Sequence, residues 1–389
     1  MGFHTYARML RAAHGRGHLG GRHAAAVTGM LGLRAGLGAV VAGARRVDDV
    51  VSPGWRRSSV RTPVWIVAAP RSGTTWMHRL MALDTERFTS MTLGETVLPS
   101  VTLQRAVSAV STADAAFGGV GEGLLRRAEK RLFAGWDGVH ALGLDRPEED
   151  EALFVYAGAS PAFWLLSPFV DAPAWRSVDG LPARERERIM RFHRGCLQRH
   201  LHGAGAGRTL LLKNTLAAAR LEALLETFPD ARFVHLVRHP YETIPSILSM
   251  FHVVWRAHLP HLAKDAPEVQ AFGRRMMASC RQYADLERRL PADRVVTVRY
   301  PDLVADPVAA VERVYDHLGL RPSSAFRRRL VEEARRARSH RSTHRYRLED
   351  FGLSRRDVDR ELGDLIARYS LDTSARAIRS SRMRSTRRA

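Results

Sequence analysis

The chain has 389 residues, of which 45% are hydrophobic, so it can build the packed core of one large domain or two medium ones, and wholesale disorder is excluded. Its formal net charge is +21, and almost all of its basic residues are arginine. Such a charge indicates an anionic partner: nucleic acid, an acidic membrane surface, or a ligand that carries phosphate or sulfate. Residues 1–61 carry +8 and residues 327–389 carry +10, so the middle of the chain is close to neutral.

The cysteines and the apolar segments indicate where the protein works. Cys196 and Cys280 form neither a disulfide framework nor a metal-ligand spacing, and we expect both to be reduced. The most apolar stretch, 24–41, is rich in glycine and interrupted by Arg34, so we expect neither a membrane span nor a secretory signal. We therefore expect the protein to be cytoplasmic, and either soluble or attached to a membrane peripherally through its basic ends.

Short apolar runs rich in branched residues alternate with helical patterns along the chain, which predicts an open parallel α/β sheet flanked by helices. A long, mostly helical insertion is expected after the first strand and helix, over about 95–208. The whole chain is then a basic N-terminal extension (1–60), one domain (61–370) and a basic disordered tail (371–389). The expected strands are 64–69, 209–212, 232–237 and 294–298, each followed by a helix, at 73–84, 217–227, 240–251 and 306–318, and the insertion has helices at 122–132, 149–157 and 184–200.

The turn after the first predicted strand is the most informative segment. It reads Pro-Arg-Ser-Gly-Thr-Thr over 70–75 and leads into a helix that begins near Gly73. Backbone N–H groups at a helix start, together with the positive end of the helix dipole, make an anion site. Arg71 adds a charged fork for phosphate or sulfate, and further donors come from the hydroxyl groups of Ser72, Thr74 and Thr75.

This turn differs from the loop of nucleotide triphosphatases, G-x-x-x-x-G-K-[ST]. If Gly73 is the second glycine of that pattern, Thr74 stands in place of the lysine. The strand 232–237 ends in Arg238 and not in the aspartate that holds the metal in that class. A kinase or NTPase of the P-loop type is therefore disfavoured and stays an alternative. The other alternative is a nucleic-acid-binding protein that acts through its basic ends.

The turn at 70–75 resembles the 5′-phosphosulfate loop of the sulfotransferases that use 3′-phosphoadenylyl sulfate (PAPS). Arg238 and Ser246, which follow a strand, resemble the pair that grips the 3′-phosphate of the donor in that family. The resemblance covers about 62–370 and implies a P-loop-like fold, PAPS as co-substrate and no metal. Further segments similar to the family, or to its bacterial and actinobacterial branch, are 211–215, 298–307, 147–151 and 344–353.

The resemblance also implies roles for individual residues. The sulfuryl group would pass in line to a hydroxyl of a small-molecule, lipid or glycan acceptor, with a glutamate as general base. Glu95 is the expected base, because Leu-Gly-Glu-Thr at 93–96 resembles the segment of tyrosylprotein sulfotransferases that holds theirs, and a pKa raised by burial would suit it. Glu149 and Asp150 are reserve candidates, and Arg71 with Lys213 would stabilise the moving charge. The expected donor-binding residues are Arg71, Ser72, Gly73, Thr74, Thr75, Trp76, Arg238, Ser246 and Tyr300.

The insertion is rich in aromatic residues near prolines. They would suit an apolar acceptor such as a phenol, a quinone or a lipid alcohol, and they would equally suit a packed core. These residues are Phe154, Tyr156, Phe163, Trp164, Phe169 and Trp175.

Overall fold

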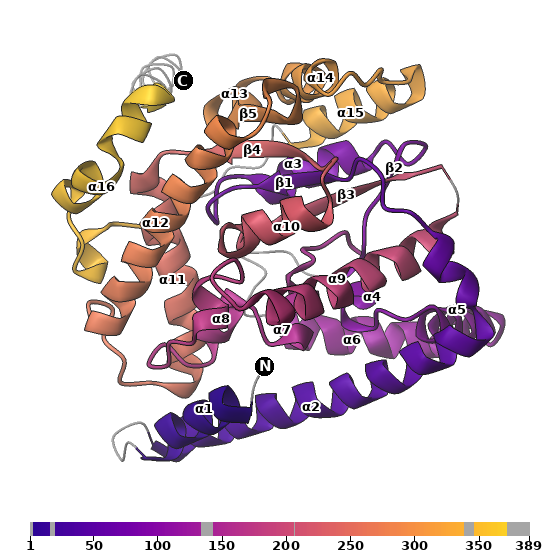
Figure 1. Ribbon diagram of the computed structural model, residues 1–389, viewed down its shortest axis with the longest axis horizontal. Helices are drawn as coiled ribbons and strands as arrows, with labels where there is room; N and C mark the ends of the chain where they lie inside the picture. The colour runs from indigo at the N-terminus through magenta and orange to yellow at the C-terminus, as the bar shows by residue number, and fades with distance from the viewer. Residues whose placement is uncertain (1–2, 16–19, 134–142, 206, 338–345, 372–389) are drawn as a thin grey trace. The chain divides into compact units, whose positions relative to one another are not determined.

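A computed structural model describes residues 3–15, 20–133, 143–205, 207–337 and 346–371 (Figure 1). All of the predicted tail except Leu371 therefore lies outside the described residues. The chain folds as two compact units. The first unit comprises Met1–Val64, Thr85–Lys213 and Arg220–Ala231, and the second comprises Trp65–Asp84, Asn214–Ala219 and Arg232–Ala389.

The second unit is built on parallel strands in the order β1-β4-β5. Each of these strands is followed by a helix, as parallel pairing requires. The register of β4 and β5 runs from Phe233 opposite Val295 to Val237 opposite Arg299. The indole of Trp65 stacks on Phe233 at 6.2 Å in its core. Its elements are β1 (Val64–Val67), α3 (Thr74–Ala82), β4 (Arg232–Val237), α11 (Pro240–His258), α12 (Pro267–Arg289), β5 (Val295–Arg299), α13 (Tyr300–Ala305), α14 (Pro307–His317), α15 (Ser324–Ala337) and α16 (Arg355–Arg368).

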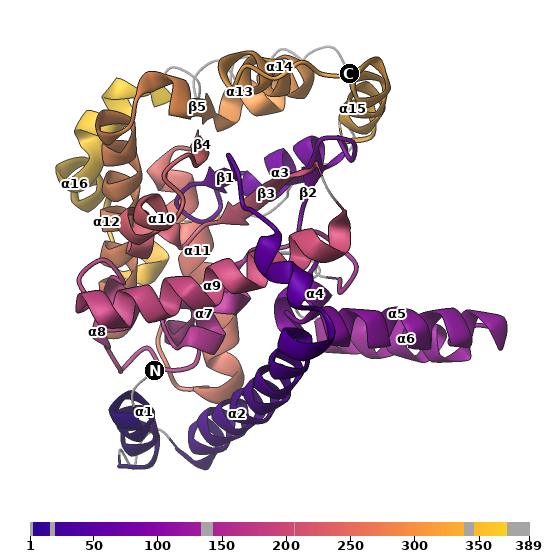
Figure 2. The same cartoon turned by 45° about the vertical axis from the view of Figure 1, so that its right-hand side comes forward.

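The first unit is mainly helical, with one parallel pair of strands, β2 and β3. Its helices α5 and α6 lie side by side as a hairpin that extends away from the rest of the unit (Figure 2). The elements are α1 (Phe3–Gly15), α2 (Gly20–Val51), β2 (Phe88–Thr89), α4 (Leu93–Val97), α5 (Val101–Ala116), α6 (Val120–Phe133), α7 (Glu151–Ala157), α8 (Pro173–Arg176), α9 (Ala183–Ala204), β3 (Thr209–Asn214) and α10 (Leu221–Thr227).

The predicted fold class is confirmed: the protein is mixed α/β, with parallel strands flanked by helices. The four predicted strands are β1, β3, β4 and β5, and the helices expected in the insertion are α6, α7 and α9. The prediction did not include β2, whose two residues are too short to leave a sequence pattern, or the long helices α2 and α12.

The expectation that no segment is apolar enough to cross a membrane is wrong for α2. This helix is 32 residues long, and its most apolar window has a mean hydropathy of 1.6, because Ala, Val and Leu outweigh the glycines and Arg34. This assignment of α2 rests on helix length and apolar composition alone. The core helix of a soluble protein or a signal sequence can have the same length and composition. Only 17% of the window is buried. Arg34 itself donates to the backbone carbonyls of Val155 and Tyr156, at 3.0 Å each.

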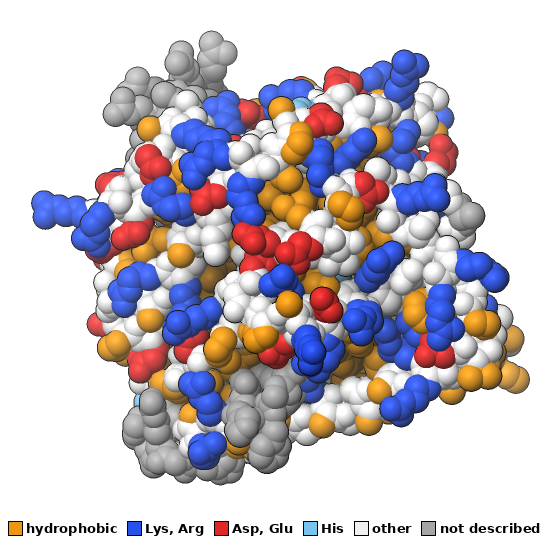
Figure 3. Space-filling model, viewed as in Figure 1, with side chains coloured by type: hydrophobic (Ala, Val, Ile, Leu, Met, Phe, Trp, Pro, Cys, Tyr) orange, Lys and Arg blue, Asp and Glu red, His pale blue; other side chains and the backbone are white. Residues whose placement is uncertain are grey.

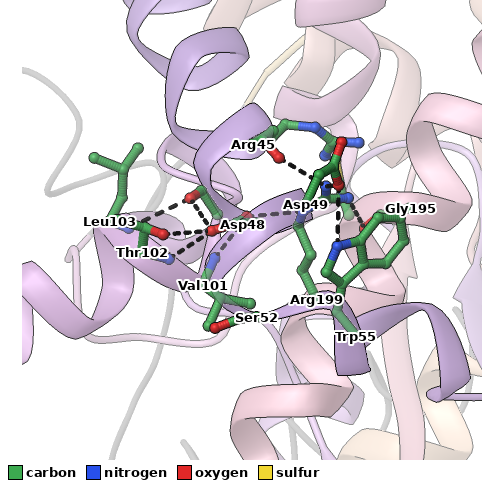
Figure 4. A network of polar contacts seen from close by, with 12 residues as sticks. Arg45, Asp48, Asp49, Ser52, Trp55, Val101, Thr102, Leu103, Gly195 and Arg199 are labelled. Atoms are coloured by element: carbon green, nitrogen blue, oxygen red, sulfur yellow. Dashed lines mark hydrogen bonds and ion pairs between the residues drawn. The ribbon is translucent and has the colours of Figure 1, made fainter.

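A buried carboxylate, Asp48 near the end of α2, joins three helices of the first unit (Figure 4). It pairs with Arg199 of α9 at 2.8 Å, and both side chains are almost completely buried. Its oxygens also accept hydrogen bonds at the start of α5, from the backbone N–H of Val101 and from the N–H and hydroxyl of Thr102. Burial raises the pKa of Asp48, but the hydrogen bonds from Thr102, Arg199 and Ser100 outweigh this and hold it below its usual value.

We predict that Asp48→Ala lowers the free energy of unfolding by about 3 kcal/mol, because the buried Arg199 loses its buried partner and keeps only the partly exposed Asp49, at 3.0 Å. Arg56→Ala is the matched control. It removes a pair with Asp49 in which the side chains are 50% and 39% exposed. Exposed pairs contribute at most about 1 kcal/mol. Urea unfolding of the full chain measures both values, and equal losses in the two variants would contradict the prediction.

Candidate functional site

The turn between β1 and α3 is formed by two residues in the left-handed region of the backbone. Arg71 has φ 73° and Gly73 has φ 94°. For a residue other than glycine this conformation costs about 1–2 kcal/mol, so the surroundings must hold Arg71 in place. Ser72, between the two, is buried, and its hydroxyl donates to the carbonyl of Ala69 at 2.7 Å. The helix α3 starts directly after this turn, at Thr74.

Gly73 is required at this turn for a second reason. A Cβ atom built on it would lie 2.6 Å from Cδ2 of Tyr300, the first residue of α13. The tyrosine ring therefore packs directly against the backbone at the start of α3. The first turn of α3 contains no acidic residue that would compete with an anion for the backbone N–H groups.

Three of the predicted donor-binding side chains converge on this turn. Nε of Arg71 donates to the Ser246 hydroxyl at 3.1 Å, and Nη1 of Arg238 donates to the Arg71 carbonyl at 3.0 Å. The Arg238 guanidinium also lies 4.2 Å from the centre of the Tyr300 ring and pairs with Glu242 at 2.8 Å. These contacts bring two cations and a hydroxyl to one helix start, which is a suitable arrangement for phosphate or sulfate.

The electrostatics of Arg71 agree with an anion site. Burial lowers its pKa, Tyr346 raises it, and the positive charge of Arg238 lowers it again. A bound anion would offset both the burial and the repulsion between the two guanidinium groups. Thr74 is buried as well, whereas Thr75 and Trp76 are half-buried at the start of α3.

Glu95, the expected base, lies in the first unit. It forms a capping box at the start of α4: its carboxylate accepts from the N–H of Thr92 at 2.8 Å, and its own N–H donates to the Thr92 hydroxyl at 3.2 Å. Oε1 of Glu95 also lies 3.0 Å from Nδ1 of His200, whose Nε2 contacts the Thr89 hydroxyl at 2.8 Å. Beside an ionised carboxylate, Nδ1 carries the proton and donates it.

The pKa of Glu95 is lowered, whereas we expected from the sequence a pKa raised by burial. Burial raises it, but the hydrogen bond and charge of His200, together with the Thr92 hydrogen bonds, hold it below its usual value. Glu95 is therefore an ionised carboxylate at neutral pH. The sequence did not reveal His200, because its partner is 105 positions away and no local spacing connects them.

Lys213 lies at the end of β3 in the first unit, and its side chain is completely buried. Its Nζ is 2.9 Å from Oε1 of Glu148 and 3.4 Å from Oε1 of Glu149. The reserve candidate Asp150 pairs with His193 at 2.8 Å, and both side chains are buried. The acidic segment 147–151 thus provides ion-pair partners for buried basic groups. The sequence alone does not show that Glu148 is the partner of Lys213.

Most of the insertion's aromatic residues belong to the core of the first unit. Phe154, Phe163, Trp164 and Trp175 are each at most 5% exposed, and Phe163 stacks on Trp175 at 5.3 Å. Among the described residues, no group of three or more His, Cys, Asp or Glu side chains is arranged to hold a metal ion.

The turn at 70–75 and the Arg238–Ser246 pair lie within residues 63–324, which match the model of the sulfotransferase family. This match spans well over half of the chain, and the chain belongs to that family; it is a transferase enzyme. It is 28% identical over 329 residues to the omega-hydroxy-beta-dihydromenaquinone-9 sulfotransferase Stf3 of Mycobacterium tuberculosis and to the protein of the same name in Mycobacterium bovis, covering 80% of this chain and 75% of each relative.

Solved structures share the fold. The sulfotransferase STF9 from Mycobacterium avium superposes with a TM-score of 0.61, at 20% identity, over 83% of this chain and 81% of that one. The sulfotransferase STF1 from Mycobacterium tuberculosis H37Rv superposes with a TM-score of 0.60, at 20% identity, over 93% of this chain and 98% of that one.

We predict that Gly73→Ala disrupts the turn, because the substitution imposes the left-handed cost of about 1–2 kcal/mol and a clash with Tyr300. The double variant Gly73→Ala/Tyr300→Ala removes the clash and should recover only part of the lost stability. Gly363→Ala is the control, since a Cβ atom in α16 meets nothing within 4 Å. Thermal unfolding measures all three, and a Gly73→Ala protein as stable as the control would contradict the prediction.

Proposed function

We propose that this sulfotransferase takes its sulfuryl group from PAPS and transfers it to a hydroxyl of an apolar, lipid-like acceptor. The observation that carries the proposal is the cluster of Arg71, Arg238 and Ser246 at the start of α3. PAPS has two anionic ends, a sulfated 5′-phosphate and a 3′-phosphate. Two guanidinium groups, a hydroxyl and a helix N-terminus together match that distribution of charge.

The donor would lie along this cluster. The backbone and hydroxyl groups of residues 72–76 would hold the 5′-phosphosulfate, with Arg71 stabilising charge on the sulfuryl group as it moves. Arg238 and Ser246 would bind the 3′-phosphate. Tyr300, which fixes both Gly73 and Arg238, would shape the space beside them. Each of these residues belongs to the second unit, so one compact unit would bind the donor.

The acceptor is proposed from the relative, because Stf3 is named for a hydroxylated dihydromenaquinone. The shared length and identity support an acceptor of the same chemical class, an alcohol on a long apolar molecule. A water-soluble alcohol or a glycan would be the contrasting outcome in an acceptor screen. The buried aromatic residues of the insertion do not contribute to this argument, because they form core.

We propose that Glu95 is the general base and that Lys213 helps to stabilise the charge on the sulfuryl group as it moves. In the reaction the acceptor oxygen bonds to sulfur as the bond from sulfur to the donor phosphate breaks, and the hydroxyl proton passes to the Glu95 carboxylate. A carboxylate that is ionised at neutral pH can take this proton directly. His200 would hold Glu95 in its ionised form and in its orientation.

We further propose that the protein acts in the cytoplasm at the surface of a membrane, where an apolar acceptor resides. The excess charge of +8 in residues 1–61 and +10 in residues 327–389 supports attraction to acidic lipids. On the face shown in Figure 3, basic side chains are interspersed with acidic ones over both units. This distribution and the family match favour neither a nucleic-acid-binding protein nor a P-loop kinase.

We predict that Arg71→Ala lowers sulfate transfer at least about a hundred-fold, as the loss of a group that stabilises transition-state charge does. The assay follows labelled sulfate from PAPS to a panel of lipid alcohols and phenols. Arg328→Ala, an exposed arginine of α15, is the control and should transfer normally. The proposal fails if the wild-type protein binds neither PAPS nor the 3′,5′-bisphosphate product.

We predict that kcat/KM of the wild-type enzyme persists until the pH falls below 4.5, because the pKa of Glu95 is lower than that ordinary value. The base acts only when ionised, so activity is present above the folded-state pKa and lost below it. In His200→Gln, burial still raises the pKa while the opposing charge is gone, and the acidic limb should move to higher pH. His317→Gln, at the exposed end of α14, is the control. Identical pH profiles for the wild type and His200→Gln would contradict the assignment of Glu95.

A further inference from the structure

The α5–α6 hairpin of the first unit has almost no core of its own. Val101, at the base of α5, is buried, whereas none of residues 102–129 is. Helices of this length are marginal in water unless one face packs against other structure. The hairpin extends from the unit with both long faces largely exposed (Figure 2).

The end of the hairpin is nevertheless well defined. The carboxylate oxygens of Asp114 accept from the backbone N–H groups of Gly121 and Glu122, at 2.7 Å each. Gly118 and Gly119 supply the left-handed residues of the turn, with φ 92° and 72°. The first turn of α6 is thus bonded to the last turn of α5, and the negative charge of Asp114 is used within the turn.

The hairpin exposes several large apolar side chains. Phe117, at the tip, is 86% exposed, and Val120 and Leu124, one turn apart on α6, are 67% and 59% exposed. The described residues include fourteen exposed large hydrophobic side chains, of which six are on the hairpin and six on α2. Hydrophobic side chains gather at the right-hand edge of Figure 3, where the end of the hairpin lies. The six residues are Val107, Val110, Phe117, Val120, Leu124 and Leu125.

Basic residues follow directly after this apolar tip. Arg126 and Arg127 are exposed within one turn of Leu124, and Arg126 pairs with Glu122 at 2.6 Å. Residues 101–133 contain five basic and three acidic residues. Exposed phenylalanine, leucine and valine next to arginine are typical of helices that enter the interface of an anionic bilayer. The hairpin as a whole therefore has a net charge of +2, and two copies would bring like charges together, so charge complementarity favours an acidic lipid surface over a second copy of the chain.

We propose that the tip of the α5–α6 hairpin inserts into the surface of an anionic lipid bilayer. Phe117, Val120 and Leu124 enter the apolar boundary, while Arg127 contacts lipid phosphates. This contact differs from attraction through the basic ends of the chain, because it depends on apolar insertion. Its use, to hold the enzyme where an apolar alcohol resides, rests on the proposed function.

Vesicle binding of the full-length protein tests the insertion. Vesicles of phosphatidylcholine, with and without phosphatidylglycerol, are sedimented with the wild type, with Phe117→Ser/Leu124→Ser and with the control Val253→Ser/Val304→Ser. The control removes two apolar side chains that are 56% and 46% exposed outside the hairpin. We expect the hairpin variant to lose at least about ten-fold in partitioning to the anionic vesicles, since each buried apolar side chain contributes strongly. The control should bind as the wild type does.

A second measurement reports insertion directly. Phe117→Cys and Val253→Cys, each with Cys280→Ser, are labelled with an environment-sensitive fluorophore. We expect a blue shift on anionic vesicles at position 117 and none at position 253. Unchanged vesicle binding of the Phe117→Ser/Leu124→Ser variant, or no shift at position 117, would overturn the inference. Light scattering could show that the Phe117→Ser/Leu124→Ser substitutions convert a dimer to a monomer. If this variant also kept its vesicle binding, that result would likewise overturn the inference.

The two proposals fail in different ways. Vesicle binding is measured without donor or acceptor. A wild-type protein that transfers no sulfate but inserts Phe117 into vesicles would disprove the proposed function and support the proposed insertion. A hairpin variant that binds vesicles normally, beside an active wild type, would disprove the insertion alone. With a water-soluble acceptor, the hairpin variant should retain wild-type transfer, because its substitutions lie outside the donor cluster.

Discussion

The first unit depends on one buried ion pair, Asp48 with Arg199. Asp48 holds the end of α2 against the start of α5, and α5 is the base of the projecting hairpin. Arg199 is followed in α9 by His200, the partner of Glu95, so the same pair fixes the position of that histidine. A buried ion pair adds little net stability over well-packed apolar residues, but removing one partner is costly because the remaining charge stays buried. Its contribution here is to set the positions of α2, α5 and α9.

The second unit shows a comparable constraint in its backbone. Arg71 adopts a left-handed conformation that is unfavourable for its residue type, and contacts from Ser246 and Arg238 hold it there. The strain is stored at the point where the anion chemistry would take place, as is common at functional sites. Because Tyr300 packs on Gly73 and under Arg238, the turn, the cation and the ring are one packed assembly. The positively charged groups are therefore in place before an anion binds, which reduces the cost of ordering them.

The sequence predicts those parts of the protein whose information is local. The turn at 70–75 follows a strand and precedes a helix within a few residues, and Arg238 and Ser246 are eight positions apart after another strand. By contrast, Asp48 and Arg199 are 151 positions apart, and Glu95 and His200 are 105 apart. No periodicity or spacing connects such partners, so the pKa of Glu95 and the binding partners of Lys213 could not be derived from the sequence. The helix α2 is hard to predict for a different reason, because its glycines and Arg34 interrupt the alanines and valines that indicate a long apolar helix.

The net charge of +21 and the two arginines near the turn act over different distances. At physiological ionic strength, charges on the surface are screened beyond about 8 Å, so the basic ends of the chain can attract an acidic surface but cannot select one anion among many. Selection needs donors fixed at the spacing of the ligand, and Arg71 and Arg238 are fixed by backbone and ring contacts. The proposed insertion of the hairpin would add a third type of contact, in which apolar area acts together with the attraction of arginine for lipid phosphates. Attraction through the basic ends, insertion of the hairpin and recognition of the donor would therefore depend on different residues, so each can be tested by its own substitutions.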